Sequence, residues 1–396
     1  MQKLLGIVLV AILSLGLNVS PANAKVAAGT TCSKIGATTS VGGKSLVCKK
    51  VGSKKLWTLS ASSMIPTPSS TPKAAGFCAD TPTAVGDITN YNACAVFLNA
   101  ESALLTRLKN SGHVAAPVKI IADPGIDSQW ISAEKARVTD AYNFWLPDFK
   151  PESFTELYWL MDTKAQLDWA NSIWLPLEGT YNGHAPIEHL SPNSCNAADS
   201  ADFGQIDWQT HTYTSHGYIT TTCAGETTPD KAFKVIHEYT HLVQYSMNIV
   251  QNGPSWLTEG GADYFGEILG NAQVSQALVD AHHKMYVQWI PNVSSWSSQQ
   301  WLTEAKSLEN ANADPHEAYY LGSLITELLV GVYGLDKYIA FMKSYSSAPN
   351  IFMGPERADS AFLPAQFQKV YGISLDDFYK DAYPYVHAMS KLYESN

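Results

Sequence analysis

Apolar and polar residues follow different spacings along this chain, and the changes in spacing predict its fold. Up to residue 226, short apolar runs bounded by turn residues predict strands, separated by segments with helical periodicity. From residue 227 the helical pattern continues almost to the end. This order indicates an α+β fold, with a mixed part over residues 76–226 and a mainly helical part over residues 227–396. The predicted strands cover residues 118–122, 157–161 and 212–222, the predicted helices cover residues 93–110, 132–145 and 164–174, and residues 175–210 read mostly as loop.

The first residues have the composition of an export signal. Lys3 precedes an apolar run over residues 4–17, and Ala22-Asn23-Ala24 fits a cleavage site after small residues. A membrane anchor is the alternative, but the run is short for a helix that spans a bilayer. We therefore expect residues 1–24 to be a signal peptide. The mature protein is expected to be secreted or extracellular, free or associated with the cell surface, with no membrane span.

A small lysine-rich unit and a linker follow the signal. Residues 25–58 contain short strand-like runs around a Gly-Gly-Lys turn and predict a hairpin closed by Cys32 and Cys48. Such a bridge would close a loop of about 16 residues and stabilise the unit by about 3 kcal/mol. Residues 59–75 are rich in Pro, Ser and Thr, which indicates a linker. The main domain is expected over residues 76–396.

Six cysteines lie after the predicted signal, and an even number suggests disulfide bonds in an exported protein. Sequence alone does not determine their pairing, but we expect each cysteine to pair with its neighbour along the chain. A cysteine-based metal site is the alternative, although no Cys-x-x-Cys pair is present to support it. The expected pairs are Cys32–Cys48, Cys78–Cys94 and Cys195–Cys223.

Charge is distributed unevenly along the chain. Residues 25–75 contain eight lysines and no acidic residue, whereas the whole chain has 26 basic and 36 acidic residues and a net charge of −10. The remainder is therefore strongly acidic, which argues against a nucleic-acid enzyme. The lysine-rich segment predicts adhesion to an anionic cell-wall polymer. The alternative is that these lysines serve solubility alone.

The His-Glu-Tyr-Thr-His segment at residues 237–241 carries the strongest chemical signal. His237 and His241 are four residues apart, so on a helix they share one face, where two imidazoles can bind one Zn²⁺. Glu238 is placed to accept a proton from a metal-bound water. Pro229 marks the first turn of this helix, whose apolar surface predicts burial almost all round. Polar side chains buried there need a partner, and a dication provides one.

A third ligand is predicted downstream, in the segment Trp-Leu-Thr-Glu-Gly-Gly-Ala-Asp. Glu259 lies 18 residues after His241, which lets the chain turn and place a second helix beside the first. Asp263 is one turn beyond Glu259 and can accept the free ring N–H of His237, which would fix the tautomer of that ligand. Three protein ligands and an open position for water are what a catalytic zinc site needs.

These two segments together resemble the gluzincin metallopeptidases, the superfamily that includes thermolysin and the aminopeptidase N type. The resemblance covers roughly residues 200–345. It implies a zincin-like fold in which the two histidines and Glu259 bind Zn²⁺. It also implies that Glu238 is the general base and that Asp263 is the hydrogen-bond partner of the first histidine.

A Tyr-x-x-Gly segment about 60 residues after Glu259 extends the resemblance. Aminopeptidase-type relatives have this pattern at a similar distance, which implies that Tyr319 donates a hydrogen bond to the oxyanion of the reaction. Tyr320 is the alternative donor, and both tyrosines can instead be packing residues. Two histidines carry weaker signals: His216 as a group that stabilises the transition state, and His316 as a residue that lines the cleft.

The motifs and the resemblance predict a secreted zinc peptidase that acts on peptides or proteins. The Gly-x-Met-Glu-Asn segment with which aminopeptidases bind a free N-terminus is absent from the sequence, so an endopeptidase or oligopeptidase is favoured. The strand over residues 212–222 is expected to be the sheet edge on which an extended peptide binds. The alternative is a wall-associated adhesion protein whose zincin fold has lost catalysis, and the presence of Glu238 argues against it.

Overall fold

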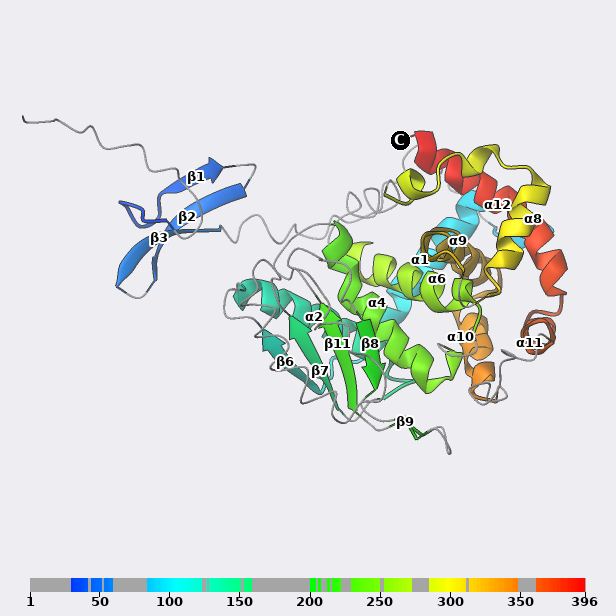
Figure 1. Ribbon diagram of the computed structural model, residues 1–396, viewed down its shortest axis with the longest axis horizontal. Coiled ribbons are helices and arrows are strands. Elements are labelled where there is room, and N and C mark those ends of the chain that lie inside the picture. Colours follow the sequence, from blue (N-terminus) through cyan, green and yellow to red (C-terminus); the bar gives the residue numbers. More distant parts are fainter. Residues whose placement is uncertain are drawn as a thin grey trace, which may run out of the picture. The chain divides into compact units, whose positions relative to one another are not determined.

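The computed structural model of the chain contains two compact units, residues 1–65 and residues 66–396 (Figure 1). The predicted signal peptide, residues 60–75 of the predicted linker and the helix predicted over residues 164–174 lie outside the described residues. The structure describes residues 30–41, 44–51, 53–59, 84–122, 126, 128–150, 153–158, 200–203, 206–207, 212–213, 216–221, 229–249, 253–272, 285–310, 313–347 and 361–395.

The first unit is a three-stranded antiparallel sheet in the order β1-β2-β3. Its strands are β1 (Thr38–Val41), β2 (Lys44–Val51) and β3 (Lys54–Leu59). The first two strands form the hairpin predicted around the Gly-Gly-Lys turn, and β3 extends it to a sheet. Leu46 and Cys48 of the central strand are buried, as expected for the middle of so small a unit.

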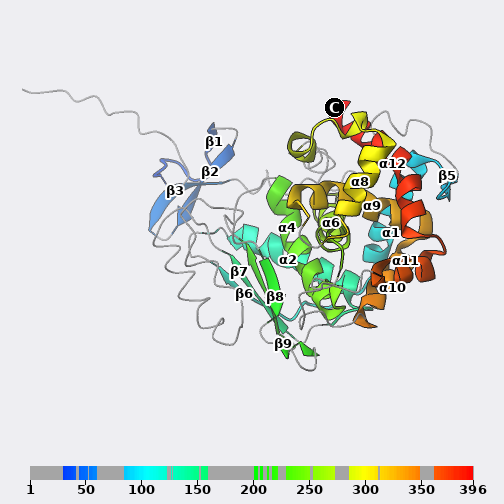
Figure 2. The ribbon, with the colours of Figure 1, turned by 45° about the vertical axis from the view of Figure 1, so that its right-hand side comes forward.

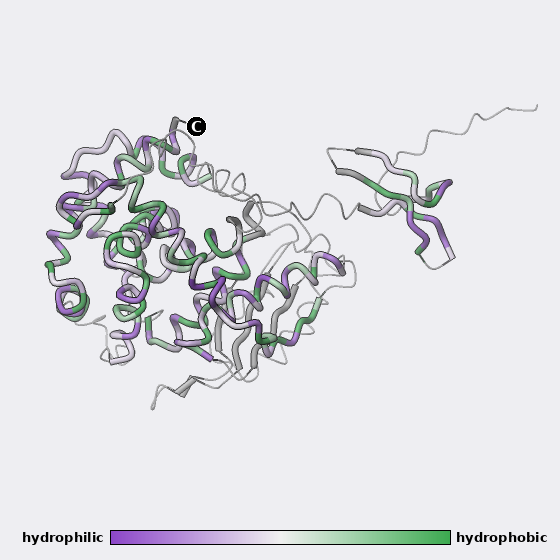
Figure 3. Tube along the Cα trace, turned by 180° about the vertical axis from the view of Figure 1, so that it is seen from behind, coloured by the Kyte–Doolittle hydropathy of each residue, from purple (hydrophilic) through white to green (hydrophobic). Residues whose placement is uncertain are grey.

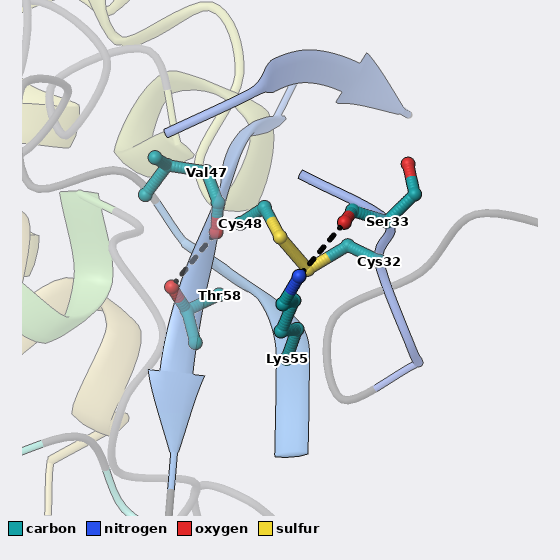
Figure 4. The surroundings of a disulfide bond; sticks show 6 residues. All are labelled: Cys32, Ser33, Val47, Cys48, Lys55 and Thr58. Atoms are coloured by element: carbon teal, nitrogen blue, oxygen red, sulfur yellow. Dashed lines mark hydrogen bonds between the residues drawn. A yellow bond between two sulfur atoms is a disulfide. The ribbon is translucent and has the colours of Figure 1, made fainter. Parts of the chain in front are cut away.

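A disulfide bond between Cys32 and Cys48 ties the segment before β1 to the middle of β2 (Figure 4). This predicted pair is therefore confirmed. Beside it, the Lys55 ammonium donates a hydrogen bond to the carbonyl oxygen of Ser33 at 3.2 Å. The bridge and this contact hold the N-terminal segment against the sheet, which lacks the apolar volume to do so by packing alone.

The other cysteine pairs stay predictions. Cys94, at the start of the first helix of the second unit, is disulfide-bonded. Its expected partner Cys78 lies outside the described residues, as do Cys195 and Cys223.

A four-stranded mixed sheet forms the first part of the second unit (Figures 1 and 2). The strand order is β6-β7-β11-β8, in which the first three strands are parallel and β8 runs antiparallel to β11. Their bounds are β6 (Val118–Ala122), β7 (Ser153–Tyr158), β8 (Ser200–Phe203) and β11 (His216–Thr221). Two short pairs, β4 (Gly86–Asp87) with β5 (Asn90–Tyr91) and β9 (Ile206–Asp207) with β10 (Thr212–Tyr213), lie outside this sheet.

The order of these strands corrects the predicted sheet. Because β11 lies between β7 and β8, the strand predicted over residues 212–222 is internal, and β6 and β8 are the edges among the described strands. β8 falls within residues 175–210, which the composition predicted to be mostly loop. Its residues Ser-Ala-Asp-Phe include three types with little preference for strands, and pairing with β11 overrides that preference.

Helices make up the rest of the second unit. α1 has its predicted bounds, and α2 begins at Ser128 rather than at residue 132. The fold is therefore a mixed α+β fold with a mostly helical C-terminal part, as predicted. The bounds are α1 (Ala93–Asn110), α2 (Ser128–Trp145), α4 (Pro229–Ser246), α6 (Ser255–Gly266), the π-helix η3 (Glu267–Ala272), the 3₁₀ turns η4 (Val293–Ser295) and η5 (Tyr345–Ser347), α8 (Ser298–Ser307), α9 (Pro315–Tyr333), α10 (Leu335–Ser344), α11 (Phe362–Tyr371) and α12 (Leu375–Ser395).

α9 lies at the centre of the helical part. It packs against α1, α6 and α12, and Leu321, Ile325 and Leu328 on it are fully buried. Hydrophobic segments concentrate among these packed helices (Figure 3). No single described helix is long and apolar enough to cross a bilayer; α9 meets that test only together with the segment that follows it, across a bend of 119°.

α4 connects the two parts of this unit. It packs against β8 and β11 on the sheet and against α6 and η3 in the helical part (Figure 2). Polar side chains of α4 at this junction are therefore placed between the edge of the sheet and the helical core.

Candidate metal centre

Two histidines of α4 lie one helical turn apart. The helix begins at Pro229, as its sequence predicts, and Ile236, Tyr239 and other apolar residues bury it on several sides. His237 Nε2 and His241 Nε2 are 3.0 Å apart. Because 8% and 12% of their side chains are exposed, both imidazoles are largely removed from water.

α6 brings a carboxylate to these two nitrogens, as predicted for Glu259. Its Oε2 lies 3.6 Å from His237 Nε2 and 3.4 Å from His241 Nε2. Donor atoms that surround a tetrahedral zinc at about 2.0–2.2 Å are about 3.3 Å from one another. The three donors thus have the spacing required to hold one metal ion. The Glu259 side chain is 34% exposed, so the cluster is accessible from solvent.

The charges around the cluster favour a cation. Burial lowers the pKa of the His237 imidazole, but the carboxylates of Asp263 and Glu259 outweigh this effect and raise that pKa to about 10. Burial opposes ionisation of Glu259, but the two imidazoles hold the pKa of its carboxyl well below the usual range. The buried Glu238 carboxylate adds negative charge near both histidines. Without a metal ion the site therefore binds protons, and a metal ion would compete with these protons for the same donor atoms.

Asp263 lies beside the first histidine, although His237 Nδ1 makes no hydrogen bond in the described structure, so the predicted role of Asp263 as its acceptor stays a prediction. Its Oδ1 lies 3.5 Å from His237 Nδ1, and the carboxylate is buried, with an exposed fraction of 2%. The hydroxyl of Tyr286 donates a hydrogen bond to the other carboxylate oxygen. Tyr286 therefore fixes the direction of Asp263, whose other oxygen faces the ring of His237.

Gln244 orients the second histidine. Its Nε2 donates hydrogen bonds to the carbonyl oxygens of Leu257 and Thr258 on α6, at 2.9 and 2.8 Å. These two bonds fix which end of the amide is nitrogen, so Oε1, 2.8 Å from His241 Nδ1, must accept a proton from that ring. The same side chain thereby joins α4 to the turn of α6 that precedes Glu259.

The contacts of the two Nδ1 atoms determine which ring nitrogens can bind a metal ion. The hydrogen bond from His241 Nδ1 to Gln244 leaves a lone pair on Nε2 of the neutral ring. The Asp263 carboxylate, 3.5 Å from His237 Nδ1, favours the same tautomer in that ring. Two such lone pairs and the Glu259 carboxylate, at 3.0–3.6 Å from one another, repel unless a cation lies among them. The donor set of this chain thus fits a dication in both spacing and protonation.

Two glycines let α9 approach this site. The backbones of Gly260 on α6 and Gly322 on α9 are so close that a Cβ on Gly260 would lie 2.4 Å from the Cα of Gly322. This close packing places Tyr319, one turn before Gly322, with its ring centroid 5.9 Å from that of His237. The Tyr-x-x-Gly spacing thus has a physical cause, because the glycine allows the approach that brings the tyrosine to the cluster.

The remaining predicted residues lie elsewhere or are not described. Tyr320 is buried and donates a hydrogen bond to Ser390 Oγ at 3.0 Å, so the alternative donor belongs to the core. His316 is exposed, with its ring 4.7 Å from that of Trp289, and no contact with the cluster is described. The backbone of His216 begins β11, and its side chain lies outside the description.

Sequence reasoning missed Gln244 and Tyr286. Gln244 follows His241 by three residues, and this helical spacing places the two side chains on one face. That signal was available but was not used. Tyr286 lies 23 residues beyond Asp263, and no local pattern links them, because their contact depends on tertiary packing.

Comparison with known proteins adds no relative. No family model matches the chain, and neither a curated protein nor a solved structure is significantly similar to it. Its function is therefore inferred from the residues and geometry of the site.

Proposed function

We propose that the protein is a zinc-dependent peptidase with a zincin-like fold. The observation that carries the proposal is the convergence of two imidazole nitrogens and one carboxylate oxygen at 3.0–3.6 Å, with Glu238 beside them. Two histidines and a glutamate are a ligand set of catalytic zinc, and the partly exposed Glu259 leaves room for water. The resemblance of the two segments to gluzincins supports the same function.

Glu238 is the proposed general base. When bound, zinc would act as a Lewis acid that lowers the pKa of water and polarises a carbonyl group. Glu238 then takes a proton from the attacking water and later delivers it to the leaving amine. Its position next in sequence to His237 supports this role, since it keeps the carboxylate close to both imidazoles.

Tyr319 is the proposed oxyanion donor. Its ring lies beside that of His237, and the side chain is only partly buried, which supports contact with a substrate bound at the cluster. A donor aimed at the developing negative charge contributes about 3–4 kcal/mol to lowering the barrier. Tyr320 makes a matched comparison, because it is adjacent in sequence but bonded to Ser390.

The proposed substrate is an extended peptide that pairs with β8. β8 is one of the two edges of the sheet among the described strands, and it packs against α4, the helix that carries both histidines. An edge strand offers backbone N–H and C=O groups to an extended peptide, and these main-chain hydrogen bonds do not require a free N-terminus. Together with the absence of the Gly-x-Met-Glu-Asn segment, this favours cleavage within chains over removal of N-terminal residues.

Hydrolysis of an unfolded protein tests the proposal. Casein is incubated with the zinc-loaded protein, with the chelator-treated protein and with Glu238→Gln, and new N-termini are identified. We expect wild type alone to cleave internal bonds, while the variant retains zinc. If the wild type and Glu238→Gln are equally inert at full zinc occupancy, catalysis is excluded and the adhesion alternative takes its place.

A further inference from the structure

The β2–β3 hairpin of the first unit ends in a group of exposed lysines, here called the lysine tip. Strand pairing places Lys50 directly opposite Lys55. Like charges directly opposite each other destabilise a sheet, and residues 25–75 contain no acidic residue that could offset them. Much of the end of the hairpin is coloured hydrophilic in Figure 3, although the exposed Val51 lies there too. The lysine tip consists of Lys49, Lys50, Lys54 and Lys55.

The four charges lie on both faces of the hairpin. Paired residues share a face, and neighbours along a strand alternate between faces. Lys50 and Lys55 therefore share one face, whereas Lys49 lies on the other. Lys54 is on that second face too, because it pairs with Val51. The pairing of β2 with β3 and the disulfide at Cys48 preform this arrangement.

We propose that the lysine tip binds a flexible linear polyanion with phosphate groups along its backbone. A flat membrane or a rigid duplex that lies against one face of the hairpin contacts the two charges of that face. A flexible chain can pass around the end of the hairpin and contact all four. Lysine ammonium groups suit phosphate as point charges that need no fixed geometry. Each has three N–H donors, so Lys55 can contact a phosphate while it donates a hydrogen bond to the carbonyl oxygen of Ser33. This binding is independent of the metal centre and would hold the protein on a phosphate-bearing surface polymer.

Salt dependence of binding tests the proposal on the full-length protein, with linear inorganic polyphosphate as the probe. Flexible polyanions release counterions with a slope of about −0.7 in log K against log salt for each phosphate contacted. Four contacts therefore predict a slope of about −3 and affinity about 50-fold weaker at 200 mM than at 50 mM salt. Replacing all four lysines of the tip by Gln is expected to abolish this binding. As a control, four exposed lysines of the second unit are replaced by Gln, which removes the same amount of charge and is expected to leave polyphosphate binding unchanged. These are Lys109, Lys135, Lys369 and Lys391.

Two double variants test the contribution of each face. Lys49→Gln with Lys54→Gln, and Lys50→Gln with Lys55→Gln, are each expected to reduce the slope to about −1.5. If one pair accounts for the whole slope, the charges act from one face and the proposal is wrong. Tighter binding to phosphatidylglycerol vesicles or to double-stranded DNA at the same salt concentration overturns it as well. Unchanged polyphosphate binding by the quadruple variant would also overturn the proposal.

Discussion

Replacement of Gln244 by Leu should weaken metal binding, although Gln244 is not a ligand. The side chain is fully buried and makes three polar contacts, to His241 Nδ1 and to the carbonyl oxygens of Leu257 and Thr258. At about 1 kcal/mol for each hydrogen bond, their loss lowers the free energy of unfolding by about 3 kcal/mol. Loss of a group that orients a ligand lowers metal affinity about 10- to 100-fold, which corresponds to about 1.4–2.8 kcal/mol.

Two measurements separate these effects: urea denaturation of the metal-free protein, and zinc affinity by competition with a chromophoric chelator. Thr240→Val is the matched control, because Thr240 is buried on the same helix and donates one hydrogen bond to Ile236 O at 2.9 Å. It is expected to cost about 1 kcal/mol of stability and leave zinc affinity unchanged. If Gln244→Leu lowers zinc affinity no more than Thr240→Val does, Gln244 does not orient His241 for metal binding.

Three further predictions concern residues around the site and core. Tyr319→Phe is expected to lower kcat on casein about 10²- to 10³-fold at unchanged zinc content, whereas Tyr320→Phe should cost stability only; equal rate losses would contradict the assignment. Gly322→Ala is expected to lower the free energy of unfolding by about 3 kcal/mol in urea denaturation, because the added Cβ would lie 2.9 Å from backbone atoms; unchanged stability would rule out the close helix contact. Burial raises the pKa of the Glu327 carboxyl from 4.5 to about 8, so the folded state keeps a proton that the unfolded state loses, and stability falls as pH rises between these values. Glu327→Gln should remove this fall, so urea denaturation curves of wild type and variant should differ more at pH 8 than at pH 5. A difference at pH 5 but not at pH 8 would contradict the expected fall in stability.

The local features of the metal centre were predictable from the sequence. The four-residue spacing of His237 and His241, and of Glu259 and Asp263, is a property of single helices, so each pair could be placed on one face from the sequence alone. Their convergence required a turn between helices, and the 18 residues that separate His241 from Glu259 allow one.

Features that depend on pairing between distant segments were predicted poorly. The order of the strands is set by tertiary contacts, so β8 was expected to be loop and the 212–222 strand was expected at the edge. The hydrogen bond from Tyr286 to Asp263 likewise joins two helical segments by packing. Gln244 differs from these, since helical spacing places it near His241, but its bonds to the α6 backbone follow only from the crossing of the two helices.

X-ray absorption at the zinc edge of the purified protein measures the coordination of the proposed metal centre. We expect one zinc per chain, bound by two imidazole nitrogens and by oxygen at about 2.0–2.2 Å, with one imidazole lost in His241→Ala. An unchanged spectrum in His241→Ala, or zinc bound mainly by sulfur, would contradict this expectation.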